Sequence, residues 1–326
     1  MKKLLAFIIL SIAMVSCYNN YITDYLYDAI YFPNVIDVRT FVVGEGMKVD
    51  VGVTLAGVHS NSRDRNVSFT FDNTLITPAM LATEQSSSNV WVKTPTVPVA
   101  ALLPLPSNYY TISNPNTMVI KEGTWAGVVT IRPDTTNFLN DSLKTMYGTY
   151  VLPFRITAAD ADTVLLSKNY NVVGFKFENM LFGNYWHGGA ALVNRPAKAD
   201  TTIVYRWSVQ DASTKIWTLT TAGPSTLYTN GYYSQQTAKN ELKLVLKGST
   251  VYVSAATGST KPYVSDGTST YNAPLLLQNR KVFLKYKYLD ATSGYTYHCT
   301  DTIYFRNRFR DGVNEWQDEN PAHYVQ

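Results

Sequence analysis

The residues in this chain whose types could recognise a ligand are tyrosines and tryptophans beside expected turns in its second half. Of the 24 tyrosines, 14 lie from Tyr185 onward, as do four of the six tryptophans. Sugar rings present C–H faces that stack on aromatic planes, and polar groups at the rim of such a platform can bind the hydroxyls. Packing within a sheet is the commoner role for any one aromatic residue. The candidates for ligand stacking are Tyr185, Trp186, Trp217, Tyr228, Tyr232, Tyr233, Tyr271 and Trp316.

Catalytic and metal chemistry find little support in the sequence. The four histidines are scattered, with no second ligand at metal-binding spacing, so no metal site and no cofactor is expected. His187, between Trp186 and Gly188, is interpreted as a turn residue. No nucleophile motif, phosphate-binding loop or dinucleotide fingerprint occurs. We therefore expect a protein that is not an enzyme. A glycosidase, which needs two facing carboxylates among the 24 acidic residues, ranks third among the alternatives.

The composition indicates a secreted all-β protein with two domains. With 326 residues the chain can bury two cores of ordinary size, and only 16% of its residues are charged. Many short segments bounded by turn residues are typical of sandwiches and barrels, and not of nucleotide-binding α/β enzymes. The net charge of +4 is not gathered into a basic stripe, which argues against nucleic acid as a partner.

Residues 1–17 have the architecture of an export signal. Lys2 and Lys3 precede an apolar run, residues 4–15, that is too short for a convincing membrane span. The run ends in Val-Ser-Cys17, which resembles the lipobox of bacterial lipoproteins. That resemblance implies acylation of Cys17 and anchoring in the outer membrane, with display at the cell surface favoured over the periplasmic face. The alternative is an ordinary signal peptide with an incidental cysteine. Residues 18–28 would form a tether.

Residues 29–177 are expected to form an immunoglobulin-like β-sandwich of about seven strands. Apolar and polar residues alternate in Lys48–Gly57, which gives a strand one buried face and one solvated face. Thr117–Gly123 and Trp125–Pro133 are expected to pair as a hairpin. Pro95–Pro106 holds four prolines and is expected to be extended.

Residues 178–326 are expected to form a second β domain, an antiparallel barrel or sandwich. Lys281–Asp290 and Gly294–Phe309 are predicted to be long paired strands, and no helical period of useful length interrupts the series. Trp207 alternates in register with Ile203 and is expected to face the core.

The two domains are expected to join within Phe177–Val193. Three glycines of this segment, Gly183, Gly188 and Gly189, bracket Tyr185 and Trp186. Glycine accepts backbone conformations that other residues avoid, so a sharp turn is predicted here before extended structure resumes.

Ordered motifs run along the chain from the lipobox to the joint. They are AIYFP (Ala29–Pro33), VTLAGVHSN (Val53–Asn61), LLPLPSNYYTIS (Leu102–Ser113), VIKEGTWAGVVTI (Val119–Ile131), YVLPFRIT (Tyr150–Thr157) and FGNYWHGG (Phe182–Gly189). Together they resemble two-domain Bacteroidetes lipoproteins of poorly defined function, encoded beside outer-membrane glycan importers of the starch-utilisation type. The resemblance implies an immunoglobulin-like first domain, a β-rich second domain and a role near glycan capture. FGNYW followed by an antiparallel series is also similar to the opening of lipocalin-type barrels.

A short acidic motif occurs five times. Asp-Thr or Asp-Ser followed by Thr, Leu, Val or Ile resembles the O-glycosylation acceptor motif of exported Bacteroidetes proteins. The same dipeptide suits a turn-to-strand junction equally well. The acceptors would be Thr135, Ser142, Thr163, Thr201 and Thr302.

These observations favour a non-enzymatic cell-envelope lipoprotein whose second domain binds oligosaccharide or polysaccharide, in support of an outer-membrane importer complex. The alternative from another class is an adhesin or assembly module that binds a protein partner by strand addition at an exposed edge. Aromatic side chains that converge on one groove would favour the glycan, whereas an unprotected edge strand would favour the protein.

Overall fold

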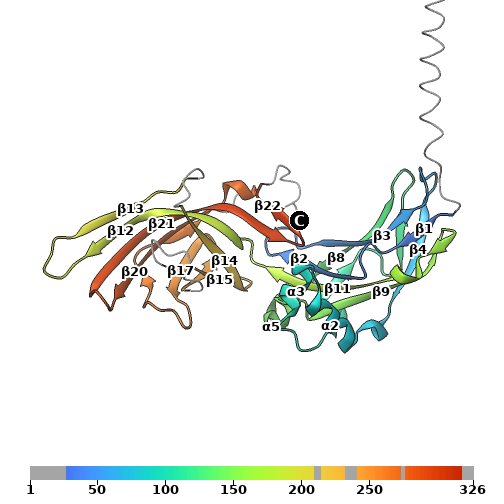
Figure 1. Ribbon diagram of the computed structural model, residues 1–326, viewed down its shortest axis with the longest axis horizontal. Helices are drawn as coiled ribbons and strands as arrows, with labels where there is room; N and C mark the ends of the chain where they lie inside the picture. The colour runs from blue at the N-terminus through green and yellow to red at the C-terminus, as the bar shows by residue number, and fades with distance from the viewer. Residues whose placement is uncertain (1–26, 209–213, 232–240, 273–275, 318–326) are drawn as a thin grey trace, which may run out of the picture.

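The structure, a computed structural model, describes residues 27–208, 214–231, 241–272 and 276–317. Two β domains lie end to end, a sandwich followed by a barrel (Figure 1). The all-β fold class expected from the sequence is confirmed, and the second domain is a barrel.

The sandwich consists of two sheets that exchange strands along the chain. The first sheet has the order β10 (Thr163–Val164), β1 (Ala29–Tyr31), β3 (Val49–Ala56), β8 (Ala126–Pro133) and β6 (Tyr110–Ile112). The second has the order β2 (Ile36–Val42), β11 (Tyr170–Glu178), β9 (Tyr150–Ala159), β4 (Arg65–Phe71) and β7 (Thr117–Ile120), with β5 (Leu103–Pro104) also paired to β9. Neighbouring strands in both sheets are mostly antiparallel, but β2 and β11 run parallel along the whole of β2.

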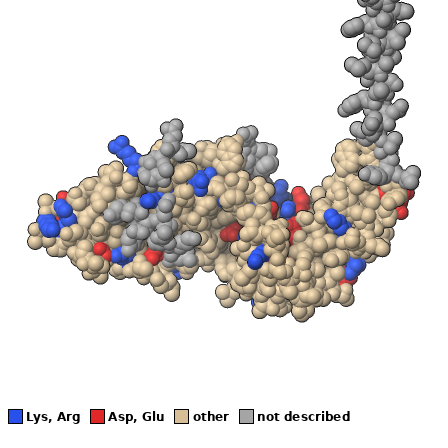
Figure 2. All heavy atoms as spheres, viewed as in Figure 1, with Lys and Arg blue, Asp and Glu red and all other residues tan. Residues whose placement is uncertain are grey.

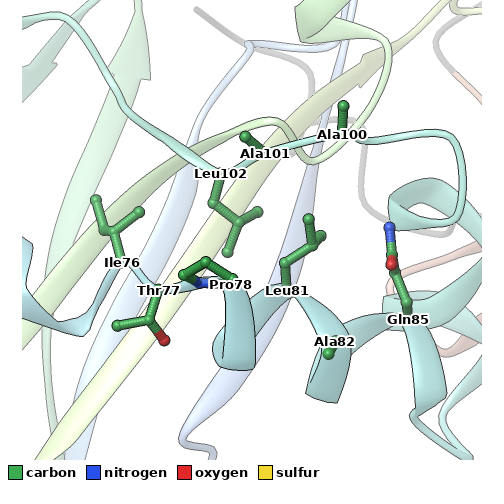
Figure 3. Close-up of a pocket in the computed structure, with 9 residues that line it drawn as sticks. All are labelled: Ile76, Thr77, Pro78, Leu81, Ala82, Gln85, Ala100, Ala101 and Leu102. Atoms are coloured by element: carbon green, nitrogen blue, oxygen red, sulfur yellow. The ribbon is translucent and has the colours of Figure 1, made fainter.

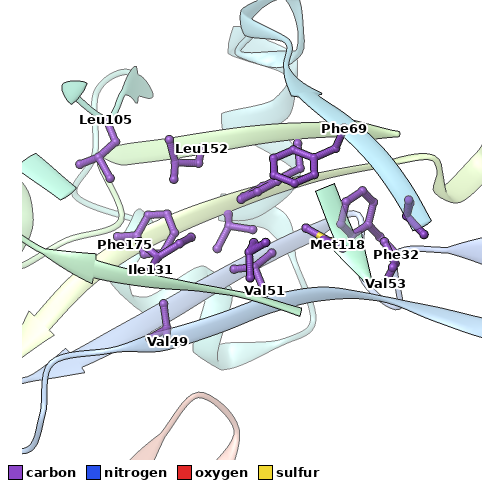
Figure 4. Packing of buried hydrophobic residues seen from close by; sticks show 14 of the residues in the cluster. Phe32, Val49, Val51, Val53, Phe69, Leu105, Met118, Ile131, Leu152 and Phe175 are labelled. Carbon is purple, nitrogen blue, oxygen red and sulfur yellow. The ribbon is translucent and has the colours of Figure 1, made fainter. Parts of the chain in front are cut away.

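The sandwich core follows from the two-residue period of its strands. In β3, Val49, Val51, Val53 and Leu55 are buried, while the residues between them are half-buried or exposed. Side chains from β3 meet those of the opposite sheet, such as Phe69 of β4, between the two layers (Figure 4). Each fully buried side chain of this kind contributes about 1.5–3 kcal/mol, so this interior is the main stabilising feature of the domain.

The hairpin expected between residues 117 and 133 is wrong. Strand β7 pairs with β4 in the second sheet, whereas β8 pairs with β3 and β6 in the first. The chain therefore passes from one sheet to the other around Gly123. Alternation fixes which face of each strand is buried, and two strands that bury their faces in one core can lie opposite each other instead of side by side.

Short helices cover the outer face of the second sheet. In α2 (Pro78–Ser86), the Thr77 hydroxyl accepts from the Met80 amide at 3.1 Å and proline occupies the first turn, a favourable helix start. The Leu81 side chain packs on outward-facing residues of β9 and β11. The other helical segments of the sandwich are α3 (Val90–Thr96), α4 (Thr135–Asn140), α5 (Ser142–Thr145) and the 3₁₀ turns η1 (Asn73–Leu75), η2 (Ser107–Tyr109) and η3 (Leu166–Lys168). One further 3₁₀ turn, η4 (Leu277–Asn279), lies in the second domain.

The extended conformation expected for Pro95–Pro106 is wrong at its beginning, because Pro95 lies inside α3. Proline costs a helix one backbone hydrogen bond. Pro95 is tolerated because α3 ends one residue later and the Asn89 side chain caps its start by accepting from the Trp91 amide at 3.0 Å.

The second domain is an eight-stranded barrel. Strand β12 (Gly183–Asn194) pairs with β14 (Lys215–Gly223) through its first half and with β13 (Thr201–Tyr205) through its second half. The other strands are β15 (Thr226–Thr229), β16 (Leu242–Lys247), β17 (Thr250–Ala255), β18 (Val264–Ser265), β19 (Ser269–Tyr271), β20 (Lys281–Asp290), β21 (Tyr295–Arg310) and β22 (Val313–Glu315). The circuit β12-β14-β15-β16-β17-(β18 and β19)-β20-β21 closes because β21 also pairs with β12. The expected pairing of the two long strands is confirmed from Lys281↔Tyr304 to Asp290↔Tyr295.

The sharp turn expected within Phe177–Val193 lies at residues 180–181, and not beside Tyr185 and Trp186, which are both within β12. The chain turns before Gly183, which has φ +135° and lies so close to β21 that a Cβ would be 2.9 Å from the Arg308 Cβ. Asn179 fastens that turn to the barrel, because its side-chain amide donates to the Pro224 carbonyl at 2.7 Å. The glycine-rich sequence therefore marks crowding by neighbouring strands and not a bend.

A buried ion cluster joins the two domains. Glu45, in the turn between β2 and β3, accepts from Arg308 at 2.8 and 2.7 Å and lies 2.7 Å from Arg280. Arg308 also donates to Glu315 at 2.5 Å. The side chains of Glu45, Arg280 and Arg308 are at most 3% exposed. Figure 2 shows few charged side chains over this face of the molecule, with both signs gathered at the waist between the domains.

The β21–β22 hairpin reaches from the barrel onto the sandwich beside this cluster. Asp311 at its tip accepts from the Thr40 amide at 3.1 Å and from the Thr40 hydroxyl at 2.7 Å. Phe309 stacks on Trp91 of α3 with ring centroids 5.2 Å apart. Polar, ionic and aromatic contacts thus fix the barrel on the sandwich.

Candidate functional site

The most promising site is an open hollow on the outer wall of the barrel, with a volume of about 340 Å³. Three segments form it: β12, β21 and the chain from the last residue of β13 onward. We call it the outer hollow. Its lining residues are Gly188, Gly189, Tyr205, Arg206, Trp207, Thr302 and Tyr304.

Alternation along β12 and β21 creates this hollow. Residues 185 and 187 of β12 point into the barrel, so Trp186 and Gly188 face outward beside Tyr304 and Thr302. After β13 the chain crosses over Gly188, where a Cβ would be 3.0 Å from the Trp207 Cδ1. A glycine at this position therefore lets the tryptophan lie against the strand.

Aromatic rings and cations form one side of the outer hollow. The rings of Trp207 and Tyr304 have centroids 4.5 Å apart and an interplanar angle of 39°. Trp186 pairs with Tyr304 across the strands, and the Arg306 guanidinium lies 4.8 Å from the Trp186 ring centroid. The Lys281 ammonium lies 5.1 Å from the Tyr304 centroid. These rings are half-buried, so part of the aromatic surface faces solvent.

A buried polar cluster lies behind the outer hollow, inside the barrel. Asp301, whose side chain is 0% exposed, accepts from the Tyr205 hydroxyl and, at 2.7 Å, from the Tyr286 hydroxyl. His187 Nε2 lies 3.0 Å from Asp301 Oδ2, and the His187 ring stacks on Trp217 with centroids 4.1 Å apart. Burial, and next the charge of Asp301, raises the pKa of both tyrosines far above its usual range, so both hydroxyls remain donors. Because Tyr205 also lines the hollow, this cluster holds one of its walls in place.

Replacing Asp301 with alanine is expected to lower the free energy of unfolding of the barrel by about 2–3 kcal/mol, because two tyrosine hydroxyls lose their buried acceptor. Urea unfolding followed by tryptophan fluorescence measures the loss. Asp200→Ala is the control, because Asp200 is exposed and accepts a hydrogen bond from Asn194 at 2.7 Å. A change in Asp301→Ala no larger than in this control would contradict the role given to the cluster.

The structure describes six of the eight aromatic candidates from the sequence and does not bring these six together on one surface. Tyr185 and Trp217 are 0% exposed in the barrel core, so their proposed role in stacking on a surface ligand is corrected to packing. Trp186 lies at the edge of the outer hollow, Tyr228 is half-buried on β15, and Tyr271 packs partly against the core. Trp316, 58% exposed, follows β22, which pairs with the end of β21, while Tyr232, Tyr233 and the lipidation candidate Cys17 lie outside the described residues.

Sequence reasoning missed the main residues of the outer hollow. Trp207 was expected in the core, but β13 ends at Tyr205, and beyond it alternation no longer decides which way the side chain points. His187 was expected in a turn, yet it lies mid-strand because β12 is unbroken. In the sequence, Asp301 was singled out only as part of an O-glycosylation-like motif. In the structure its carboxylate is buried beside His187.

Two other hollows are less suited to a ligand. One lies beside α2 in the sandwich, has apolar walls that include Ile76, Leu81 and Leu102 (Figure 3), and measures about 180 Å³, below the usual ligand-pocket range. The side-chain amide of Gln85, at the edge of this hollow, already donates hydrogen bonds to the carbonyls of Thr96 and Val99 and is not available to a ligand. The other, about 410 Å³, lies beside Tyr288 and His298, but its polar and aromatic groups are already engaged: Asp266 contacts both His298 and Lys287, at 2.6 and 3.3 Å, and the Tyr288 ring stacks on Tyr297.

The described residues contain neither a metal cluster nor a membrane-spanning helix. No group of three or more His, Cys, Asp or Glu side chains there is arranged to hold a metal ion. No helix in those parts of the chain combines the length and the apolar character needed to cross a membrane.

The chain is similar to solved structures from Bacteroides ovatus. A structural-genomics protein of unknown function superimposes with a TM-score of 0.62 and 16% identity, covering 91% of this chain and 99% of its own. A second protein of unknown function gives a TM-score of 0.43 and 15% identity, covering 89% and 100% of the two chains. A multidomain protein including DUF1735 gives 0.42 and 13%, with the same coverage. The first of these similarities shows that another protein shares this fold over nearly its whole length.

Sequence comparison gives one partial match. A family model described as "-like, N-terminal domain" matches residues 20–163, which include most of the sandwich. No curated protein matches the chain. Together with the shared fold, these findings support the resemblance to Bacteroidetes proteins of unknown function.

Proposed function

We propose that this chain is a non-enzymatic, lipid-anchored protein of the bacterial outer membrane that binds glycan at the outer hollow. The observation that carries the proposal is the convergence of Trp207, Tyr304 and Trp186 on one exposed surface. Partly exposed aromatic faces suit the C–H faces of sugar rings. The Thr302 hydroxyl and the Arg206 guanidinium beside them supply the polar anchors that orient a ligand. Since the hollow is open, it suits a segment of a long chain better than a small enclosed molecule.

The arrangement of the domains supports display of this site away from a membrane. Strand β1 lies at the end of the sandwich remote from the barrel (Figure 1). A lipid on Cys17 would therefore attach at the sandwich end and leave the barrel farthest from the bilayer. The sandwich then acts as a spacer, and an outer-membrane importer complex is the proposed recipient of the captured glycan.

The groups around the outer hollow favour binding over catalysis. None of its described lining residues carries a carboxyl group, whereas glycoside hydrolysis requires two carboxylates beside the scissile bond. The nearby Asp301 is fully buried and accepts two tyrosine hydroxyls. The described lining residues therefore offer aromatic and polar contacts to a ligand, but none of them has a carboxyl group that could protonate a departing sugar.

Trp207→Ala and Tyr304→Ala are each expected to weaken glycan binding by about tenfold or more, equal to about 1.4 kcal/mol. Affinity electrophoresis of residues 18–326 through gels that contain plant, host and microbial polysaccharides measures the effect. Tyr252→Ala is a matched control, because Tyr252 is 54% exposed on β17 and also carries a lysine, Lys247, 5.2 Å from its ring centroid. Retardation that survives both hollow variants, or is lost equally in the control, would place the site elsewhere.

A protein-binding role is the alternative, and β13 is the observation that favours it. This strand ends the barrel sheet, is paired on one side only among the described strands, and exposes 61% of Val204. An extended segment of a partner could add to this edge through main-chain hydrogen bonds. Absence of retardation by every glycan, together with a partner whose binding is lost in Val204→Pro, would favour this role.

A further inference from the structure

We propose that the outer hollow prefers acidic glycans, whose sugar rings carry carboxylate or sulfate groups; this inference rests on the function proposed above. Aromatic stacking by itself does not distinguish charged from neutral sugars. The charged side chains around the aromatic surface of the hollow can make this distinction.

Three cations surround the aromatic surface. Arg206 is exposed and lines the hollow directly. Arg306 lies over Trp186, and Lys281 lies over Tyr304. Contact with a ring holds a cation in place without neutralising its charge. The three charges are therefore arranged on the surface where a sugar would stack.

These cations lack the counter-charges found for other basic groups of the chain. Among the described residues, no carboxylate lies within 4.0 Å of Arg206, Arg306 or Lys281, and the lining contains no acid. By contrast, Arg65, Arg155 and Arg308 each have a carboxylate oxygen at 2.5 Å. An anion from a ligand would supply the charge that the protein does not.

The geometry of a sugar acid fits this arrangement. A carboxylate or sulfate projects from the rim of the ring, so the ring can stack on Trp207 while its anion meets a neighbouring guanidinium. Guanidinium groups bind such anions with two parallel hydrogen bonds, and charge-assisted bonds are roughly twice as strong as neutral ones. A neutral glycan would stack equally well, but the cations would remain hydrated and would form no ionic contact with it.

Matched polymers test this preference. Residues 18–326 are run through gels that contain polygalacturonate or its methyl ester, and dextran sulfate or unmodified dextran, over a series of NaCl concentrations. The test variant is Arg206→Gln with Arg306→Gln. The control is Lys243→Gln with Lys247→Gln, which removes the same charge from β16 on the opposite wall of the barrel.

We expect at least one acidic polymer to be bound about tenfold more tightly than its neutral form, and the arginine variant to lose about tenfold in affinity for it. Binding of the neutral form should not change, and the lysine variant should bind like the wild type. Equal binding of both forms, or equal losses in the two variants, would overturn the preference for acidic glycans while leaving stacking on Trp207 intact. No retardation by any glycan, or retardation insensitive to Trp207→Ala, would overturn the proposed function itself. The two polymer pairs also separate a preference for carboxylate from one for sulfate.

Discussion

Glu45→Ala is expected to lower the free energy of unfolding by about 3–5 kcal/mol, because it leaves buried arginines without their shared carboxylate. Glu45 is the only residue of the sandwich in the described cluster, and it contacts both Arg280 and Arg308. Burial by itself would raise the pKa of Glu45, but hydrogen bonds and charges, first from Arg308 and then from Arg280, outweigh it and hold that pKa below its usual value. The carboxylate is therefore ionised in the folded protein. Its removal leaves the positive charges of Arg280 and Arg308 buried in the domain interface without this counter-charge.

Urea unfolding at neutral pH measures this effect, and Lys121→Ala provides the comparison. Lys121 pairs with Asp64 at 2.7 Å, but both side chains are about half exposed or more. Such a surface pair contributes roughly 0–1 kcal/mol. Similar losses in the two variants would show that the cluster does not hold the domains together.

Glu84 is expected to make the protein less stable as pH rises from about 5 to about 8. This α2 residue is 0% exposed, and neither carboxylate oxygen has a hydrogen-bond partner among the described residues. Burial raises its pKa from 4.5 to about 8. The folded state therefore keeps a proton that the unfolded state releases above pH 4.5, so rising pH favours unfolding. At about 1.4 kcal/mol per pH unit, the loss over this window is on the order of 4 kcal/mol.

Glu84→Gln removes the titrating group and should flatten this part of the stability profile. The glutamine amide also lacks a partner in the helix packing, but that cost is the same at every pH. Chemical denaturation at intervals from pH 5 to pH 8 gives the slopes, and Glu122→Gln, at an exposed position, gives the background. Equal slopes in wild type and Glu84→Gln would mean that Glu84 does not titrate in this range.

Much of the fold could be predicted because burial on one face leaves a two-residue period. That period identified β3 and the pair β20–β21, and the lack of a helical period indicated a second β domain without deciding between a barrel and a sandwich. It could not assign β7 and β8 to different sheets, because alternation describes the face of a strand and not its neighbour. Nor could it identify the glycines of β12 as crowded strand positions, since turns and close packing both select glycine.

The candidate site was less accessible to sequence reasoning because its parts come from separate strands. Trp186 was chosen for its place near glycines and does lie at the outer hollow. Tyr304 lies within the long strand β21, where nothing in the sequence marks it as a binding residue. It becomes part of an aromatic surface because Trp207, just after the end of β13, contacts its ring. His187 and Asp301 come together because β12 pairs with β21 and closes the barrel. No local sequence pattern predicts this long-range pairing.

The indole N–H signals of the six tryptophans provide the most direct test of glycan binding at the outer hollow. In a two-dimensional ¹H–¹⁵N NMR titration with a glycan that retards the protein, the Trp207 signal should move most and that of Trp186 next. Trp217 in the barrel core and Trp125 on the sandwich should not move. Single tryptophan substitutions assign the signals. Shifts confined to Trp316, Trp125 or Trp91, with Trp207 unmoved at saturation, would contradict the proposal.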